Sequence, residues 1–368
     1  MSRPVEPLFE PFTFNGLTLP NRIVMAPMTR SKSPNGIPGA DVAAYYRRRA
    51  EAETGLIITE GTTVNTPVAS GDPNVPKFWG EDSLKGWKRV VEEVHGAGGK
   101  IMPQIWHMGM MRNPSKSTHP DIMSHGPSGL MMPGKKLSEP MTKEEIRQTV
   151  EAFGRAAADA REAGFDGVEV HGAHGYIIDQ FFWDGTNLRD DEYGGAELVA
   201  RSRFAVEIVE AIRREVGDDY PLIFRFSQWK QQDFSVKMAP TPELLAAFLK
   251  PLSDAGVDMF HCSQRRFWEP EFEGSDLNLA GWAKKLTGKP SMTVGSVSLS
   301  GEFIASFAGE ASEATGIDDL IERLEAGEFD LVAVGRALLV DPEWARKVHT
   351  GAFDQLMPFK PEALATLS

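Results

Sequence analysis

The sequence predicts an α/β fold, a (β/α)8 TIM barrel with an N-terminal β-hairpin cap. Short, almost continuously apolar runs alternate with longer amphipathic segments, as is typical of parallel strands buried on both faces and linked by helices. The first βα turn contains no G-x-G-x-x-G sequence, which disfavours a doubly wound open sheet. The candidate strands are Arg22–Pro27, Leu56–Gly61, Ile101–His107, Gly167–His171, Leu222–Ser227, Met259–Ser263, Ser291–Val297 and Leu331–Arg336.

Amphipathic segments between these runs have apolar residues at helical spacing, and a glycine, a common helix stop, follows each of them. Thr142 and Glu145 give one of them a capping-box pattern at its start. We expect helices over Ser83–Ala97, Thr142–Ala163, Arg203–Val216, Pro242–Ala255 and Ile317–Ala326.

Two segments interrupt this alternation. Phe12–Pro20 alternates around Asn15-Gly16, a strong hairpin signal, and we expect this hairpin to cap the closed end of the barrel. Met108–Met141 is long and rich in Met, Pro, Gly and Ser, and loops of such length are usually functional and often lids. Since no linker, repeat or low-complexity tract is apparent, the sequence predicts a single domain over residues 1–368.

The bulk composition is that of a globular protein, with 41% hydrophobic and 25% charged residues. A formal net charge of −13 disfavours nucleic acid and anionic membranes as partners. Cys262 is the one cysteine, so no intrachain disulfide can form, which fits a reducing compartment. Neither a signal-like N-terminal segment nor a membrane-length apolar run is apparent, and we expect a cytoplasmic soluble protein.

The carboxyl ends of the strands should carry the active site, because TIM barrels place their chemistry there. Glycines end the seventh and eighth candidate strands, where barrels often bind phosphate through backbone N–H groups, although a glycine can also simply make a turn. Arg225 lies within an apolar strand and needs an anionic partner, either a carboxylate or a cofactor. The strand ends present Ala26, Pro27, Met28, Thr29, Gly61, Gln104, Trp106, His171, His174, Tyr176, Gly295, Ser296, Gly335 and Arg336.

His171, His174 and Tyr176 also have alternative interpretations. His171 and His174 are either metal ligands, histidines bonded to core neighbours, or hydrogen-bond donors that polarise a carbonyl oxygen. The metal interpretation needs further ligands, and no H-E-x-x-H spacing supplies them, so we expect no metal. Tyr176 is either a proton donor or a packing residue.

Six stretches along almost the whole chain carry distinctive motifs. They are LFEPFTFNGLTLPNRIVMAPMTR at 8–30, TGLIITEGT at 54–62, QIWHMG at 104–109, HGAHGYIIDQFF at 171–182, TNLRDDEYGG at 186–195 and VGR at 334–336. Taken together and in this order, they resemble the motifs of the Old Yellow Enzyme family. The resemblance implies an enzyme that carries FMN in one barrel domain, takes reducing equivalents from NADPH or NADH, and reduces the C=C bond of activated alkenes.

The resemblance also implies roles for the strand-end residues. The histidine pair would bind the substrate carbonyl or nitro oxygen, Tyr176 would protonate the α-carbon, and Trp106 would shape the substrate pocket. Thr29 would hydrogen-bond the O4 edge of the flavin. The remaining FMN contacts would come from Ala26, Pro27 and Met28 at the ring, Gly61 and Gln104 at the pyrimidine side, Arg225 at the N1–C2 edge, and Gly295, Ser296, Gly335 and Arg336 at the phosphate.

Departures from the family pattern leave the substrate open. Met110 stands where relatives often have Arg, and 227–230 (SQWK) lacks the proline that many relatives have there. Phe267, Trp268 and Phe272 are pocket walls, part of a subunit interface, or part of a closed loop. The expected partner is a small electrophilic alkene, and a homo-oligomer is possible. The alternatives are an FMN barrel oxidoreductase of other chemistry, such as oxidative N-demethylation, and a metal-dependent barrel hydrolase.

Overall fold

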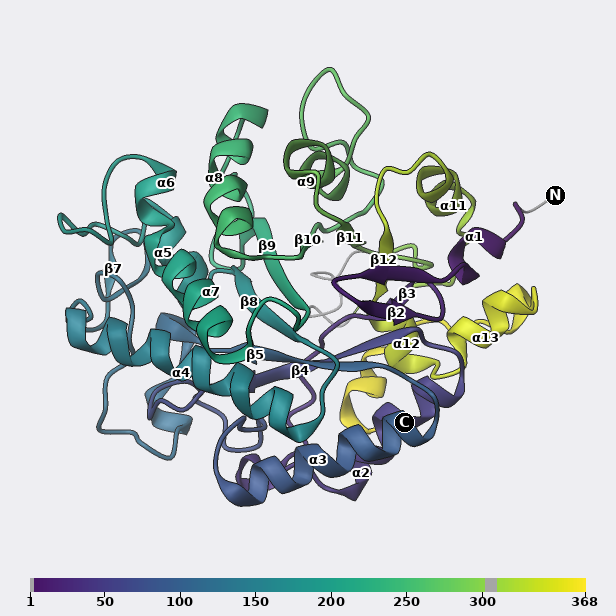
Figure 1. Cartoon of the computed structure of the whole chain (residues 1–368), viewed down its shortest axis with the longest axis horizontal. Helices are drawn as coiled ribbons and strands as arrows, with labels where there is room; N and C mark the ends of the chain where they lie inside the picture. Colours follow the sequence, from purple (N-terminus) through teal and green to yellow (C-terminus); the bar gives the residue numbers. More distant parts are fainter. Residues whose placement is uncertain (1–2, 302–309) are drawn as a thin grey trace.

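The computed structural model describes residues 3–301 and 310–368, and within them eight parallel strands form a closed barrel (Figure 1). The barrel order is β10-β11-β12-β3-β4-β5-β8-β9, so pairing of β12 with β3 closes it. Each candidate strand of the sequence overlaps one of them, which confirms the predicted TIM barrel, although β4, β8 and β9 each run two or three residues beyond the predicted end. The strands are β3 (Ile23–Met25), β4 (Leu56–Thr63), β5 (Ile101–Trp106), β8 (Val168–His174), β9 (Leu222–Lys230), β10 (Met259–Ser263), β11 (Ser291–Val294) and β12 (Leu331–Val334).

Helices surround the barrel, and the five predicted from the sequence are present with ends within two residues of those expected. Thr142 caps α4, and it forms a complete capping box with Glu145. Gly164 ends α4 in the left-handed conformation, with φ of 91°. The helices are α1 (Glu6–Phe9), α2 (Ala40–Glu51), α3 (Glu81–Gly96), α4 (Lys143–Ala163), α5 (Ile177–Phe182), α6 (Leu198–Arg201), α7 (Arg203–Val216), α8 (Pro242–Ala255), α9 (Leu279–Thr287), α11 (Asp318–Glu325), α12 (Arg336–Val340) and α13 (Trp344–His349).

The predicted N-terminal hairpin is present and closes the amino end of the barrel. Strands β1 (Phe12–Phe14) and β2 (Leu17–Leu19) pair antiparallel around Asn15 and Gly16, whose φ angles are 40° and 74°. Phe14 and Leu19 join the cluster of buried side chains that fills the barrel interior. The Asn15 side chain donates to the backbone oxygen of Asp218 and to the carboxylate of Asp258, which precede β9 and β10. The opposite, carboxyl end of the barrel is therefore the one left for a site.

Residues 108–141 are more ordered than the sequence indicated. They contain the 3-10 turns η2 (Gly109–Met111) and η3 (Pro114–Lys116) and a small antiparallel pair, β6 (Leu130–Met132) and β7 (Lys135–Lys136). Further 3-10 turns lie at η1 (Pro34–Gly36), η4 (Phe353–Gln355) and η5 (Pro361–Ala365). The long segment is thus a folded excursion between β5 and α4.

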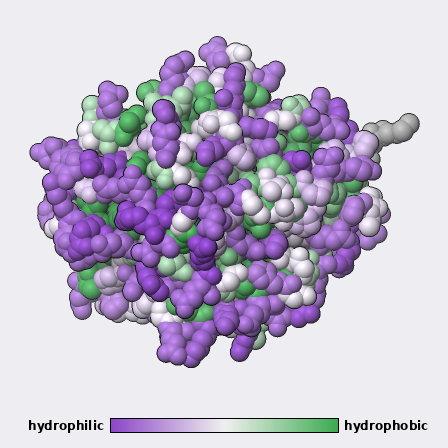
Figure 2. Space-filling model, viewed as in Figure 1, coloured by the Kyte–Doolittle hydropathy of each residue, from purple (hydrophilic) through white to green (hydrophobic). Residues whose placement is uncertain are grey.

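The surface seen in Figure 2 is mainly hydrophilic, and its hydrophobic side chains form small separate patches. This agrees with the strongly negative net charge of −13. Among residues 3–301 and 310–368, no helix is both long and apolar enough to cross a membrane.

Candidate active site

One cavity of about 240 Å³ opens at the carboxyl ends of the strands, and every site residue predicted from the sequence lines it. The backbone irregularities of the barrel help to assemble the site. A register shift in β4 between Ile58 and Gly61 sets Gly61 opposite Gln104 of β5. The predicted residues that line the cavity are Ala26, Pro27, Met28, Thr29, Gly61, Gln104, Trp106, His171, His174, Tyr176, Arg225, Gly295, Ser296, Gly335 and Arg336.

The cavity also has walls that the sequence analysis missed. Trp229 and Gln231 belong to β9 and the residue just beyond it, because this strand continues to Lys230 rather than ending at Ser227. Ser263 ends β10, so the rule used for the other strand ends could have identified it. The remaining missed walls are Gln264, Arg265, Val294, Val297, Leu299, Ala333, Leu339, Phe359 and Leu364.

A buried polar network lies under the cavity. The Gln104 side chain donates to Glu169 Oε1 at 2.8 Å, and Glu169 Oε2 lies 2.7 Å from His261 Nδ1. Arg225, on the strand between them, is 7% exposed, and its Nε–H has no hydrogen-bond partner among the described residues. Because an unpaired buried donor is costly, the Arg225 guanidinium fits a cavity ligand that presents an acceptor to it.

His171, His174 and Tyr176 form a compact group of rings on another wall. The His171 ring centroid is 5.2 Å from that of His174 and 5.0 Å from that of Tyr176, and the Tyr176 ring packs edge-on against Trp106 at 4.9 Å. His171 Nδ1 accepts from the Ala173 N–H, which leaves the proton of a neutral ring on Nε2. His174 has a φ of 66°, an uncommon value for a residue other than glycine and one often found at functional sites.

Burial keeps the side chains of His171, His174 and Tyr176 uncharged. It lowers the pKa of His171 and of His174 well below the ordinary value, and the positive charge of Arg225 lowers both further. Burial also raises the pKa of Tyr176. At neutral pH the wall therefore presents two neutral imidazoles and a protonated phenol, which are hydrogen-bond and proton donors.

The ends of β11 and β12 form the remaining wall. Gly295 has a φ of 146°, and a methyl group added there would come 2.7 Å from the Gln264 backbone oxygen, so only glycine fits. Arg336 donates to the Gly301 backbone oxygen at 2.6 Å and its guanidinium lies over the Phe359 ring. Ser296 Oγ also donates to the Gly301 oxygen, at 3.1 Å. This wall brings together the four residues predicted to hold a phosphate.

Residues 108–141 and the loop at residues 262–282, which contains Phe267, Trp268 and Phe272, contribute only Ser263, Gln264 and Arg265 to this cavity wall. Phe267 and Phe272 are buried in the core outside the barrel, and Trp268 packs edge-on against Phe267. Phe267, Trp268 and Phe272 are therefore not walls of this cavity. In residues 3–301 and 310–368, no group of three or more His, Cys, Asp or Glu side chains is arranged to hold a metal ion.

Comparisons with known proteins agree with this fold. Residues 7–355 match the model of the NADH:flavin oxidoreductase / NADH oxidase family. The chain is 33% identical over 371 residues to 12-oxophytodienoate reductase 7 of Oryza sativa subsp. japonica, covering 94% of this chain and 88% of the relative. It is 34% identical over 358 residues to the NADH oxidase of Thermoanaerobacter brockii, covering 95% of this chain and 52% of that longer relative.

Solved structures show the same architecture. The Old Yellow Enzyme homologue from Zymomonas mobilis has a TM-score of 0.81 at 27% identity, with 98% of this chain and 97% of the other covered. Morphinone reductase in complex with tetrahydroNAD has a TM-score of 0.80 at 28% identity, with 97% and 93% covered. The chain therefore belongs to the NADH:flavin oxidoreductase / NADH oxidase family, as an enzyme of the Old Yellow Enzyme type.

Proposed function

We propose that this enzyme is an FMN-dependent ene-reductase, which uses NADPH or NADH to reduce the C=C bond of an α,β-unsaturated carbonyl compound or a nitroalkene. The observation that carries the proposal is the convergence of three uncharged donors, His171, His174 and Tyr176, on the cavity that also contains Arg225. FMN, when bound, would supply the hydride chemistry that links the coenzyme to the alkene.

Features of the cavity support FMN as its occupant. The unpartnered Nε–H of Arg225 suits the electron-rich N1–C2 edge of a flavin. A methyl group added at Gly61 would come 2.7 Å from the Trp106 ring, so this wall accepts only a residue without a side chain. In this proposal Ala26, Pro27, Met28, Thr29, Gly61 and Gln104 hold the ring system, and Gly295, Ser296, Gly335 and Arg336 hold the phosphate.

The protein side chains then have separate tasks. The two histidines donate hydrogen bonds to the carbonyl or nitro oxygen, which draws electron density away from the alkene and stabilises the charge that develops on that oxygen. Tyr176 delivers a proton to the α-carbon. Trp106, packed against both Tyr176 and His171, limits the volume left for the alkene.

The proposal is tested first by the cofactor and then by the reaction. The purified protein should be yellow, and heating should release FMN, identified by mass. With NADPH or NADH under anaerobic conditions, the enzyme should convert cyclohexenone into cyclohexanone. A colourless protein that takes up no FMN, release of FAD, or loaded enzyme that leaves cyclohexenone unreduced would contradict it. Formaldehyde release from N-methyl amines would instead favour oxidative N-demethylation.

A further inference from the structure

His174 is held from three directions at the ends of neighbouring strands. Its Nε2 lies 2.7 Å from Ser263 Oγ, and its ring stacks on Trp229 at 4.6 Å with an interplanar angle of 25°. Trp229 Nε1 donates to the Ser263 backbone oxygen at 3.2 Å. Ser227 Oγ accepts from the His174 backbone N–H at 3.0 Å and donates to the Trp229 backbone oxygen. The orientation of this imidazole is thus fixed by Ser227, Trp229 and Ser263.

A neutral imidazole has a single N–H, so its contact with Ser263 decides what His174 can do. Burial and the charge of Arg225 lower the pKa of His174, and the ring is neutral. If the Ser263 hydroxyl donates to Nε2, the proton of the ring is on Nδ1, and Nδ1 can donate to a ligand. If Nε2–H donates to Ser263, Nδ1 is a bare acceptor that repels the oxygen of an enone.

We propose that Ser263 is a positioning residue that donates its hydroxyl hydrogen to His174 Nε2 and so keeps the proton of His174 on Nδ1. This inference rests on the proposed function, in which His174 must be a donor. Ser263 is 3% exposed, and His174 is the hydrogen-bond partner of its hydroxyl in the described structure. Trp229 holds the ring plane while leaving both ring nitrogens free for other contacts.

The histidine pair then presents two different nitrogens. The backbone N–H of Ala173 occupies Nδ1 of His171, so His171 donates from Nε2. Ser263 occupies Nε2 of His174, so His174 donates from Nδ1. The tautomer of each ring is selected by a donor on the protein, and the pair together offers two N–H groups to one ligand oxygen.

The tautomer can be measured directly in the FMN-loaded enzyme. The eight histidines are labelled with ¹⁵N, and the His174 signals are identified by their loss in His174→Asn. Wild-type enzyme should show a protonated Nδ1 and an unprotonated Nε2. Ser263→Ala should shift His174 toward the Nε2–H form, whereas Ser263→Thr, which retains the hydroxyl, should keep the wild-type pattern. An Nε2–H tautomer in the wild-type enzyme overturns the inference without any variant.

Ligand binding gives a second readout. The dissociation constant of 4-chlorophenol should rise roughly tenfold in Ser263→Ala and change little in Ser263→Thr, because one hydrogen bond to the ligand oxygen is lost. Ser291→Ala is the matched control, since it removes a buried hydroxyl that has no hydrogen-bond partner among the described residues. An unchanged tautomer and dissociation constant in Ser263→Ala refute the role of Ser263. Failure to reduce enones, with the expected tautomers present, refutes the proposed function instead.

Discussion

At the scale of single residues, the role proposed for Tyr176 can be tested separately from the rest of the site. It precedes α5, and its ring contacts both Trp106 and His171 edge-on. Proton donation to the α-carbon belongs to alkene reduction and not to reduction of the flavin by the coenzyme. Tyr176→Phe should therefore slow enone reduction by about 10²–10⁴-fold, the usual effect of a positioned general acid, and leave the coenzyme half-reaction nearly intact.

Stopped-flow measurement of the two half-reactions checks this expectation. Nitroalkenes should be less affected than enones, because a nitronate product can leave without protonation at carbon. Equal slowing of both half-reactions in Tyr176→Phe would show that Tyr176 binds the coenzyme or supports the fold rather than donating a proton.

Glu60 is a buried carboxyl group next to the cavity residue Gly61, and it links stability to pH. Its Oε2 accepts from the backbone N–H groups of Arg30 and Ser31 at 2.8 and 3.1 Å, and its Oε1 has no hydrogen-bond partner among the described residues. Burial raises the pKa of Glu60 from 4.5 to about 7. Because the folded pKa exceeds the unfolded one, stability from this group is complete below pH 4.5 and is lost as the pH rises through about 7.

Glu60→Gln should remove this dependence, since the amide stays neutral and its oxygen can accept the same two backbone bonds. Between pH 5 and pH 8, the free energy of unfolding of the wild type should fall relative to Glu60→Gln by about 3 kcal/mol. Urea unfolding of both proteins at the two pH values measures it. The exposed Glu273→Gln serves as control, and parallel curves for wild type and Glu60→Gln would contradict the prediction.

Many of the individual cavity residues were predictable because strand ends of a parallel barrel meet at one place. The same argument could have identified Ser263, because this residue ends β10. Trp229 was missed because apolarity ends at Ser227 in the sequence, whereas the strand continues as far as Lys230, whose ammonium is neutralised by the buried Asp179. Phe359 and Leu364 reach the cavity from the C-terminal segment, and no local pattern reports such a long-range contact.

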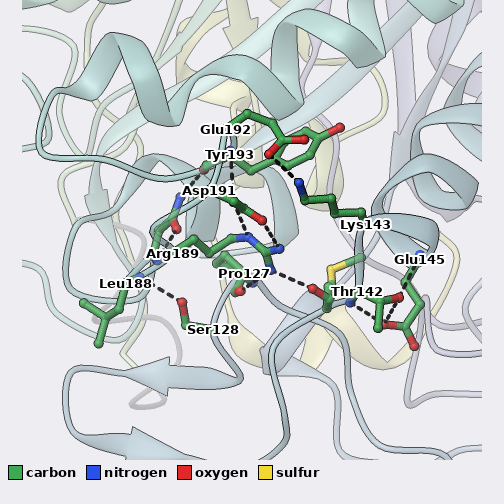
Figure 3. Close-up of polar contacts among 12 residues, drawn as sticks. Pro127, Ser128, Thr142, Lys143, Glu145, Leu188, Arg189, Asp191, Glu192 and Tyr193 are labelled. Atoms are coloured by element: carbon green, nitrogen blue, oxygen red, sulfur yellow. Dashed lines mark hydrogen bonds and ion pairs between the residues drawn. The ribbon is translucent and has the colours of Figure 1, made fainter.

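At the scale of elements, Arg189 anchors the later part of the long excursion of residues 108–141. The backbone oxygens of Pro127 and Met141 accept from NH1 of Arg189 at 2.8 and 2.6 Å, and Figure 3 shows Arg189 lying beside Pro127 and Asp191. The Asp191 carboxylate accepts hydrogen bonds from Nε and NH2 of Arg189. The Leu188 backbone N–H donates to Ser128 Oγ. The 186–195 stretch thus contributes an anchor for the excursion, and Arg189 itself does not line the cavity.

Arg189→Ala should loosen the excursion, because it leaves two backbone oxygens and a carboxylate without their donor. We expect a loss of roughly 3 kcal/mol of stability and faster tryptic cleavage at the exposed Lys135 and Lys136. Arg203→Ala, which removes an exposed partner of Glu207, should change neither. Unaltered cleavage in Arg189→Ala would show that other contacts hold the segment.

Elements with a local signal were predicted well, and those without one were not. The capping box of α4 and the Asn15-Gly16 turn are encoded within a few residues of sequence. Helix α2 lacks such a signal, since its buried face includes Arg49, whose guanidinium donates to the backbone oxygens of Leu338 and Leu339. A buried arginine satisfied by residues almost 290 positions away cannot be distinguished in sequence from an exposed one.

At the scale of the whole molecule, contacts between distant parts of the chain argue for one cooperative unit. Val332 of β12 pairs with Ile23 of β3, so the barrel closes only when both ends of the sequence have folded. Arg30 donates to the backbone oxygens of Leu364 and Thr366, which joins the loop after β3 to the C-terminal segment. The core outside the barrel likewise contains side chains from both ends of the chain.

We therefore expect residues 1–368 to unfold in a single transition, with fluorescence and far-UV circular dichroism giving coincident urea curves. The FMN-loaded protein should be more stable than the apoprotein, because a ligand that binds only the native state adds about 2.7 kcal/mol at a free concentration of one hundred times its dissociation constant. The midpoint should accordingly rise with added FMN while the transition stays single. A separate early transition that responds to FMN, followed by a later one that does not, would show that the cavity end of the barrel unfolds independently of the rest.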